Sequence, residues 1–171
     1  SVVMGRDGDL KSEATPILWD RDRLELIESG TKWLSPTPDV PGSQFPNTTE
    51  HPTDGLPRIL TYVVLKDKAT NQTYMHINTH LDYKYSVNRI SQVKVLEEFV
   101  KNYTSSSDIP IIITGDFNSQ NTEEARKKGD AVPYLLDNGF ESAADEAIEP
   151  DNHWTYSTAN YQKDVYSKCT K

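Results

Sequence analysis

Short apolar runs bounded by polar turns predict three strands in the middle of the chain. Residues 59–65 are almost continuously apolar, and residues 73–79 have the composition of a strand, with the polar turn Lys-Asp-Lys-Ala-Thr-Asn-Gln between them. Two such runs joined by a short turn are typical of neighbouring, paired strands. The β-branched run at residues 109–114 stops at Gly115 and predicts a further strand, buried on both faces.

The first third of the chain has a weaker pattern. Residues 15–19 form a short apolar stretch, and after Asp-Arg-Asp-Arg apolar and polar residues alternate from Leu24 to Gly30. This sequence of strand, turn and strand predicts a hairpin. Residues 35–57 hold six prolines and two glycines, too many for a helix or a central strand, and predict a long loop of the kind that often carries function.

Two segments have helical patterns. Within residues 87–103, apolar residues recur at the spacing of one helix face, at Val93, Leu96, Val100 and Tyr103. The solvent-exposed face of this helix is expected to carry Glu97, Glu98 and Lys101. Residues 131–138 are expected to form a short helix that ends at Gly139, because glycine tolerates the left-handed conformation of a helix C-terminus.

Together these elements predict an α/β fold. Their order is hairpin, loop, paired strands, helix, buried strand and short helix, which suits a two-sheet α/β sandwich with helices on the outer faces. A chain of 171 residues has room for one domain, so residues 1–171 are expected to form a single domain. The apolar fraction of 35% is low, but the apolar residues fall in runs, which argues against disorder.

The net charge limits the kinds of binding partner, whereas the cysteine and the N-x-T triplets do not determine the cellular compartment. The formal net charge of −8 provides no positive field to attract a nucleic-acid backbone or an anionic membrane. Cys169 is the only cysteine, so an internal disulfide is excluded. No apolar run approaches the ~18 residues of a membrane span. The chain is expected to be soluble, and secretion is one option because Asn47, Asn71 and Asn102 begin N-x-T triplets. The oligomeric state does not follow from the sequence.

The strongest chemical signal is the segment Thr-Gly-Asp-Phe-Asn at residues 114–118, at the end of the strand predicted at 109–114. Asp116 can hold or deprotonate a water molecule, and Asn118 can donate to a phosphoryl oxygen or bind a metal. The same residues also suit a plain strand-to-turn transition. His80 ends another predicted strand; a lone histidine there is often a packing residue. Two such strand ends in one chain favour a phosphate site.

These motifs, in this order, are similar to the central block of the endonuclease/exonuclease/phosphatase family. The matching residues are Asn-Thr-His-Leu-Asp at 78–82, Arg89 and Gln92 on the predicted helix, and Thr-Gly-Asp-Phe-Asn-Ser at 114–119. The resemblance covers most of residues 5–141. It implies that family's sandwich fold and a metal-dependent hydrolysis of a phosphodiester or phosphomonoester by direct attack of water, with Mg²⁺ or Mn²⁺ as the cofactor.

Carried over to this chain, the resemblance implies a role for each catalytic residue. His80 would hydrogen-bond the scissile phosphoryl group and stabilise its growing negative charge, and Glu13 would orient His80. Asp116 would orient or activate the attacking water. Asn118 would contact the phosphate and, together with Asp116, help to bind the metal.

Other matching residues have weaker assignments. Arg58 and Asn78 are candidates for phosphate binding, although each also suits a structural role. Arg89 and Gln92 are interpreted as a brace between the helix and the site. The remaining histidines match no family position and are expected to be structural or exposed: His51, His76 and His153.

The family pattern is incomplete in this sequence. Complete members have an Asn and a Gln-Glu pair on early strands, which bind the metal, and a closing Ser-Asp-His segment. Both ends of the chain read as cuts before these segments, and Asp151 and Asp164 do not replace them. The fold is therefore expected to be incomplete at both ends. The complete protein is expected to be an enzyme, and the 171-residue piece alone to be inactive.

Two other functions stay open. The chain could be a non-catalytic interaction domain that retains the phosphoesterase scaffold and contacts a partner through residues 35–57. A calcineurin-like metallophosphatase is less consistent, because the chain has four histidines and no Gly-Asn-His motif. The substrate does not follow from the motifs, but the acidic charge favours a phosphorylated small molecule or lipid headgroup over nucleic acid.

Overall fold

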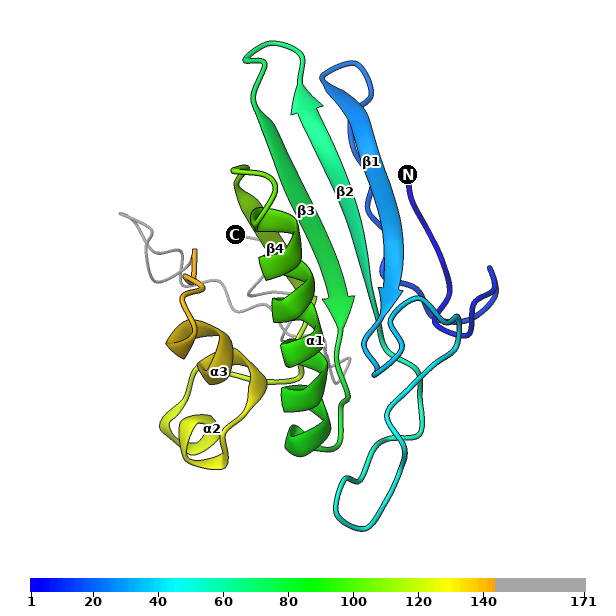
Figure 1. Ribbon diagram of the computed structural model, residues 1–171, viewed down its shortest axis with the longest axis vertical. Coiled ribbons are helices and arrows are strands. Elements are labelled where there is room, and N and C mark those ends of the chain that lie inside the picture. Colours follow the sequence, from blue (N-terminus) through cyan, green and yellow to red (C-terminus); the bar gives the residue numbers. More distant parts are fainter. Residues whose placement is uncertain (144–171) are drawn as a thin grey trace, which may run out of the picture.

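The described part of the chain is a four-stranded sheet with a long helix on one face (Figure 1). The computed structural model describes residues 1–143. The strands are β1 (Leu24–Trp33), β2 (Ile59–Asp67), β3 (Thr73–His80) and β4 (Ile111–Asp116). The helices are α1 (Ser86–Thr104), α2 (Glu123–Lys128) and α3 (Ala131–Asp137). The α/β class predicted from the sequence is confirmed.

The order of strands in the sheet follows the order in the chain. β1 pairs with β2 and β2 pairs with β3 in the antiparallel sense, whereas α1 carries the chain back so that β4 lies parallel to β3. The C-terminal ends of β3 and β4 therefore meet at one end of the sheet, the lower end in Figure 1. In open α/β sheets, ligands commonly bind outside the carboxyl ends of the strands.

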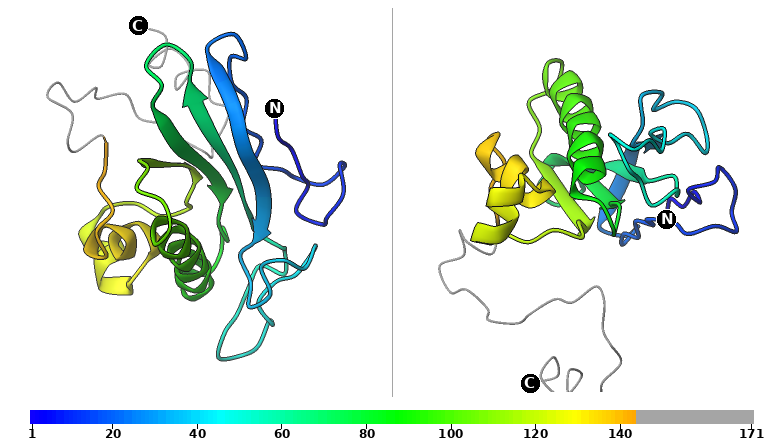
Figure 2. Two further views of the ribbon diagram at one scale, coloured as in Figure 1. Left: turned by 45° about the horizontal axis from the view of Figure 1, so that its top comes forward. Right: turned by 90° about the horizontal axis from the view of Figure 1, so that it is seen from below.

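The main core lies between the sheet and α1, which Figure 2 shows on one face of the sheet. Met75 and Ile77, at alternate positions of β3, are fully buried in the same cluster as Val93 and Leu96 of α1. Burial of an apolar side chain of this size stabilises a fold by about 1.5–3 kcal/mol. The helix predicted within residues 87–103 thus packs its apolar face against the strand predicted at residues 73–79.

The N-terminal segment contributes to a second cluster on the opposite face of the sheet. Ile17 and Val63 are buried there together. Two isolated bridges, Val2 with Ile17 and Gly5 with Ala14, give this segment its shape. Within residues 1–143 the named strands form one sheet, so the second sheet of the predicted sandwich is not seen in the part described.

The hairpin predicted from residues 15–30 is wrong. Residues 15–19 lie outside the named strands, and β1 pairs with β2 instead. Pro16 in the apolar stretch has no N–H to donate to a strand ladder, whereas β2 offers β1 a partner over nearly its full length.

Two burial predictions are also wrong. β4 is not buried on both faces: Ile112 is 51% exposed, because β4 is the last strand of the described sheet and α1 packs on its other face. Glu97, expected on the wet side of α1, is buried. Its carboxylate accepts hydrogen bonds from Lys101 Nζ (2.6 Å) and from the Tyr134 hydroxyl (2.9 Å), which compensate for its burial.

The other predicted elements are confirmed. Residues 35–57 contain neither helix nor strand, and the short helix predicted at residues 131–138 is α3. The sequence pattern did not predict α2, whose N-terminus is capped by the Thr122 side chain and whose C-terminus ends at Gly129 in the left-handed conformation. Among residues 1–143 there is no helix with the length and apolar character needed to cross a membrane.

Arg89 and Gln92 brace the site end of α1, as the resemblance implied. Arg89 Nε and Nη2 donate to the two carboxylate oxygens of Asp130 at 2.7 and 2.6 Å, and Arg89 Nη1 donates to Asp82 O. Gln92 Oε1 accepts from Asp82 N (2.9 Å). Burial would raise the pKa of Asp130, but the hydrogen bonds and charge of Arg89, with other hydrogen bonds, hold it below its usual value. The brace therefore ties α1 to α3 and to the turn after His80.

Removal of this buried ion pair should be costly. We expect Arg89→Met to lower the free energy of unfolding by about 3–5 kcal/mol, because Asp130 would stay buried without its partner. Arg126→Met is the matched control, because Arg126 and Asp137 form an exposed pair and such pairs contribute ~0–1 kcal/mol. Urea unfolding followed by circular dichroism measures both; equal small losses would contradict a bracing role.

Candidate active site

β3 and β4 bring His80 and Asp116 together. The two residues are register partners at the ends of parallel strands, so their side chains leave the same face of the sheet. His80 Nε2 lies 3.6 Å from Asp116 Oδ2, and both side chains are partly exposed. This separation is too long for a direct hydrogen bond. The two groups therefore face each other and remain accessible to a ligand.

Glu13 holds the other side of the His80 ring. Its Oε1 atom lies 2.5 Å from His80 Nδ1. A carboxylate can only accept a hydrogen bond from this nitrogen, which favours the ring form with a proton on Nδ1, and the ring is turned with Nε2 towards Asp116. The backbone hydrogen bond from Arg6 N to Glu13 O (2.8 Å) helps to place Glu13. The imidazole thus lies between two carboxylates that are far apart in the sequence.

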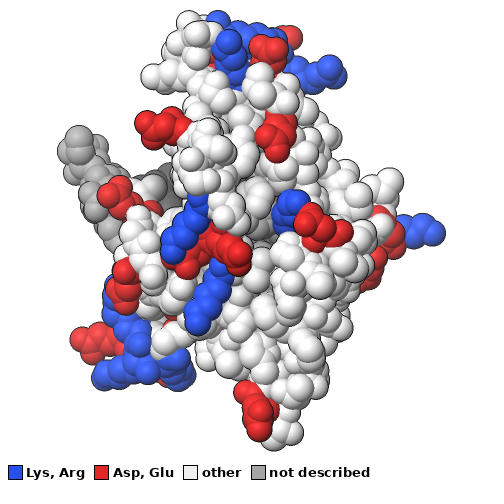
Figure 3. Space-filling model, viewed as in Figure 1, with Lys and Arg blue, Asp and Glu red and all other residues white. Residues whose placement is uncertain are grey.

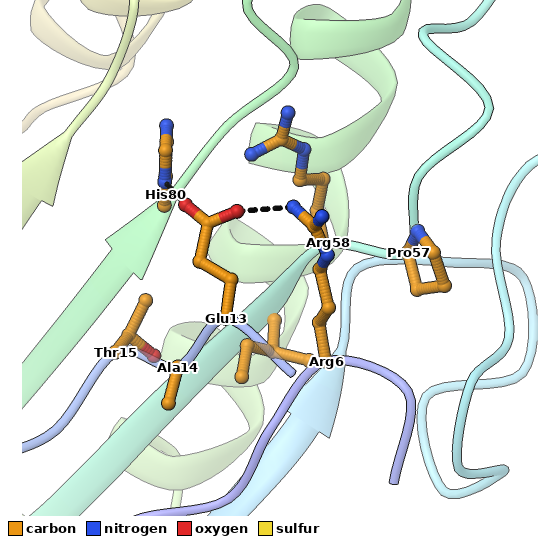
Figure 4. Close-up of a pocket in the computed structure, with 8 residues that line it drawn as sticks. Arg6, Glu13, Ala14, Thr15, Pro57, Arg58 and His80 are labelled. Carbon is orange, nitrogen blue, oxygen red and sulfur yellow. Dashed lines mark hydrogen bonds and ion pairs between the residues drawn. The ribbon is translucent and has the colours of Figure 1, made fainter. Parts of the chain in front are cut away.

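A narrow pocket beside His80 is lined by charged side chains (Figure 4). Arg6, Glu13 and Arg58 contribute to its walls, and Arg6 pairs with Glu13. Arg58 is only 4% exposed, and its Nη2 lies 2.5 Å from Asp54 Oδ2. Arg6 Nε and Arg58 Nε are buried without a hydrogen-bond partner among the described residues. The pocket has a volume of only about 10 Å³, enough for about one water molecule, and it places two guanidinium groups next to His80.

Asn118 links the two strand ends. Its backbone has φ 47°, in the left-handed region that asparagine tolerates better than most residues. Its N–H donates to Asp116 Oδ1, and its Nδ2 donates to Leu81 O, both at 3.0 Å. Leu81 N in turn donates to Asp116 O at 2.9 Å. Asn118 therefore orients the Asp116 carboxylate, with Oδ2 left towards His80.

Gly115 allows β4 to approach β3 closely at the site. Its φ is +143°, and a Cβ atom at this position would lie 2.0 Å from the backbone oxygen of Thr79. That oxygen belongs to the strand and cannot move aside as a flexible side chain could. Only glycine fits here, directly before Asp116.

Asp82 ends the matching motif at residues 78–82, but the sequence analysis assigned it no role. Its buried carboxylate accepts hydrogen bonds from Asp54 N, Lys84 N, Tyr85 N and Asn88 Nδ2. Burial would raise the pKa of Asp82, but these hydrogen bonds together hold it below its usual value. Asp82 thus joins the 35–57 loop to the turn after His80. An available signal was its place just before a helix, where aspartate commonly accepts from free N–H groups.

Asn78 lies on the His80 face of β3 but has partners elsewhere. Its Nδ2 donates to Pro16 O (3.1 Å), and its Oδ1 accepts from the Thr114 hydroxyl (3.3 Å). It is not one of the described residues that line the pocket beside His80. Its role in phosphate binding stays a prediction.

Two other histidines have structural partners away from the pocket. His51 Nε2 lies 2.8 Å from the Ser91 hydroxyl, and His76 Nε2 lies 2.8 Å from that of Thr114. Burial lowers the pKa of His76. The sequence analysis expected both histidines to be structural or exposed. Four residues considered in the sequence lie outside the described range: Asp151, His153, Asp164 and Cys169.

The described residues do not make up a metal centre by themselves. Asp116 and Asn118 are oxygen donors of the type that Mg²⁺ prefers. However, no group of three His, Cys, Asp or Glu residues within 1–143 is placed to hold a metal ion. Metal binding by Asp116 and Asn118 therefore stays a prediction.

Known proteins match the chain in sequence and in fold. No protein-family model matches it. An uncharacterized protein of Acanthamoeba polyphaga mimivirus is 30% identical over 112 residues, which are 66% of this chain and 40% of that protein. An endonuclease/exonuclease/phosphatase family protein from Bacteroides thetaiotaomicron has a solved structure that is 32% identical, with a TM-score of 0.64, and the match covers 72% of this chain and 43% of that one.

A second solved structure has a more specific name. It is a mannosyl-6-phosphatase from Bacteroides thetaiotaomicron, 30% identical, with a TM-score of 0.65 over 78% of this chain and 47% of that one. The chain thus spans less than half the length of these three proteins. The similarity extends over most of the chain.

The close approach at Gly115 gives a direct test of the site geometry. We expect Gly115→Ala to lower the free energy of unfolding by more than about 2 kcal/mol and to displace the end of β4, because of the clash and the positive φ. Gly129→Ala is the control: φ is +62° but no atom lies within 4 Å of the added Cβ, so its cost should be ~1 kcal/mol. Equal losses in thermal or urea unfolding would contradict the steric explanation.

Proposed function

Because the chain belongs to the endonuclease/exonuclease/phosphatase family, we propose that the protein hydrolyses a phosphate ester by direct attack of water. The arrangement of three side chains at one end of the sheet supports this proposal. His80 Nδ1 lies 2.5 Å from Glu13 Oε1, and His80 Nε2 lies 3.6 Å from Asp116 Oδ2. One hydrogen-bond donor and one carboxylate are therefore within reach of a single phosphoryl group.

His80 acts as the donor to the phosphoryl group. In its imidazolium form it donates through Nδ1 to Glu13 and through Nε2 to a phosphoryl oxygen. The hydrogen bond strengthens as negative charge grows in the transition state, and removal of one such preorganised donor commonly costs about 10²–10³ in rate. Glu13 keeps the ring in the orientation that makes this donation available.

Asp116 orients the attacking water. Asn118 N holds its Oδ1 atom (3.0 Å), which leaves Oδ2 to accept a hydrogen bond from the water and to take its proton. Arg58, in the wall of the pocket, donates to the non-bridging phosphate oxygens. No covalent intermediate with the protein is required.

The family resemblance implies Mg²⁺ or Mn²⁺ as the cofactor. A bound divalent ion would neutralise the phosphate charge and stabilise the leaving oxygen. The described donors alone do not complete such a site, so the steps above involve only the chain's own side chains. Asp116 and Asn118 are the residues of the chain that we propose to contribute to it.

A phosphomonoester on a small molecule is the substrate class that we favour. The similar phosphatase from Bacteroides thetaiotaomicron is named for a mannosyl 6-phosphate, and sugar phosphates are therefore the first compounds to test. The net charge of −8 disfavours nucleic acid. On the face in Figure 3, acidic and basic side chains are interspersed and do not form the basic stripe typical of a nucleic-acid-binding surface. A phosphorylated lipid headgroup remains the second choice.

A non-catalytic interaction domain is the second candidate function. The observation that favours it is the lack of a complete metal centre within residues 1–143. In this case the 35–57 loop, which Asp54 anchors to the scaffold through Asp82, would contact a partner protein.

Substitution of the two central residues tests the catalytic proposal. In the natural full-length protein, His80→Ala and Asp116→Ala should each lower kcat for a phosphomonoester by about 10²–10³, equivalent to ~2.7–4 kcal/mol. His76→Gln is the matched control, because His76 lies on the same face of β3 but outside the pocket, and kcat should change less than about threefold. Losses below ~tenfold for both central variants would argue against these roles.

Calorimetric titration separates the enzyme from the interaction domain. An enzyme should bind inorganic phosphate or Mg²⁺ at the His80 and Asp116 end, and Arg58→Gln should weaken phosphate binding by about tenfold, the cost of ~1.4 kcal/mol for a lost charged hydrogen bond. An interaction domain should bind neither ion. Circular dichroism of the Arg58 variant shows whether loss of its pairing with Asp54 has unfolded the protein.

A further inference from the structure

Arg6 has a place in the site that its position in the sequence does not reveal. Resting on the proposed function, we propose that Arg6 is a positioning residue that holds Glu13, and through it the ring of His80, in the productive orientation. Arg6 Nη1 is paired with Glu13 Oε2, and Glu13 Oε1 lies 2.5 Å from His80 Nδ1. One carboxylate therefore bridges a guanidinium and the imidazole, and Figure 4 shows these side chains together in the pocket wall.

The protein fixes Arg6 from several sides. Its N–H donates to Glu13 O (2.8 Å), and its carbonyl accepts from Trp33 Nε1 (2.6 Å). Trp33 is itself buried at the end of β1. The Arg6 side chain is only 19% exposed. Arg6 is thus anchored to the sheet and can serve as a rigid support.

Glu13 needs such a support because its side chain is exposed and no strand holds its backbone. Its side chain is 42% exposed, and it comes from a segment that lies outside the named strands. A glutamate with only one partner has several rotatable bonds and competing solvent interactions. The pair with Arg6 fixes the second oxygen, and an error of ~1 Å in the placement of a catalytic group can cost about a hundredfold in rate.

The same pair moderates the charge beside the substrate. Glu13 and Asp116 flank His80 with two carboxylates, which would repel a phosphate dianion. Arg6 balances the charge of Glu13. Arg6 pairs with the carboxylate that adjoins His80, whereas Arg58 pairs with Asp54, so we assign Arg6 to orientation and local charge, and Arg58 to contact with the phosphate.

The test compares Arg6→Gln and Arg6→Lys with the matched control Arg23→Gln. Arg23 also pairs with a carboxylate, that of Asp67, but is largely exposed and away from the pocket. Steady-state kinetics on the natural full-length protein should give a fall in kcat of about tenfold or more for Arg6→Gln, with KM changed less than about threefold, because orientation and not substrate binding is lost. Arg6→Lys should recover at least part of the loss, and Arg23→Gln should match the unsubstituted protein.

A second measurement does not depend on activity. The Nδ1 proton of His80, which lies next to Glu13 Oε1, should give a downfield proton NMR signal, identified by its loss in His80→Gln. This signal should broaden or shift in Arg6→Gln and persist in Arg23→Gln. A signal unchanged in Arg6→Gln, or a rise in KM with constant kcat, would overturn the positioning role. If no phosphate ester is hydrolysed by the unsubstituted protein, the proposed function fails, and the NMR comparison still decides the role of Arg6.

Discussion

The parallel pairing of β3 with β4 is the constraint on which the rest of the site depends. It makes His80 and Asp116 register partners and requires the backbone of Gly115 to pass against Thr79 O. The hydrogen bond from Leu81 N to Asp116 O extends this pairing beyond the last strand residue. The separation of the imidazole and the carboxylate is therefore set by strand geometry, which is stiff, and not by loop conformation.

A buried polar network around Asp82 stabilises the turn that follows the end of β3. Asp82 accepts hydrogen bonds from backbone N–H groups of the 35–57 loop and of the turn before α1, and Arg89 and Gln92 join it to the helix. Arg89 is paired with Asp130, and the buried Asp82 carboxylate is stabilised by four hydrogen bonds. Buried networks of this kind favour one arrangement, because the alternatives leave a buried charge without a partner. Rigidity at the site thus comes from groups that do not touch a ligand.

The electrostatics of the site differ from those of the whole molecule. The chain carries a net charge of −8, yet the pocket beside His80 is lined by Arg6 and Arg58, which pair with Glu13 and Asp54. Short-range pairs decide the binding of a small anion, whereas net charge governs the approach of an extended polyanion. The similar proteins are more than twice as long as the matched region.

The sequence by itself determined the elements with strong periodicity and the identity of the central pair. The apolar runs of β2 and β3 and the helical spacing of α1 are local patterns, and His80 and Asp116 each follow a strand that the pattern predicted. Only the tertiary structure decided that β1 pairs with β2, that Glu97 is buried, and that Arg6 reaches Glu13. These depend on contacts between segments distant in the chain, and the pattern of a single segment does not specify which partner it meets.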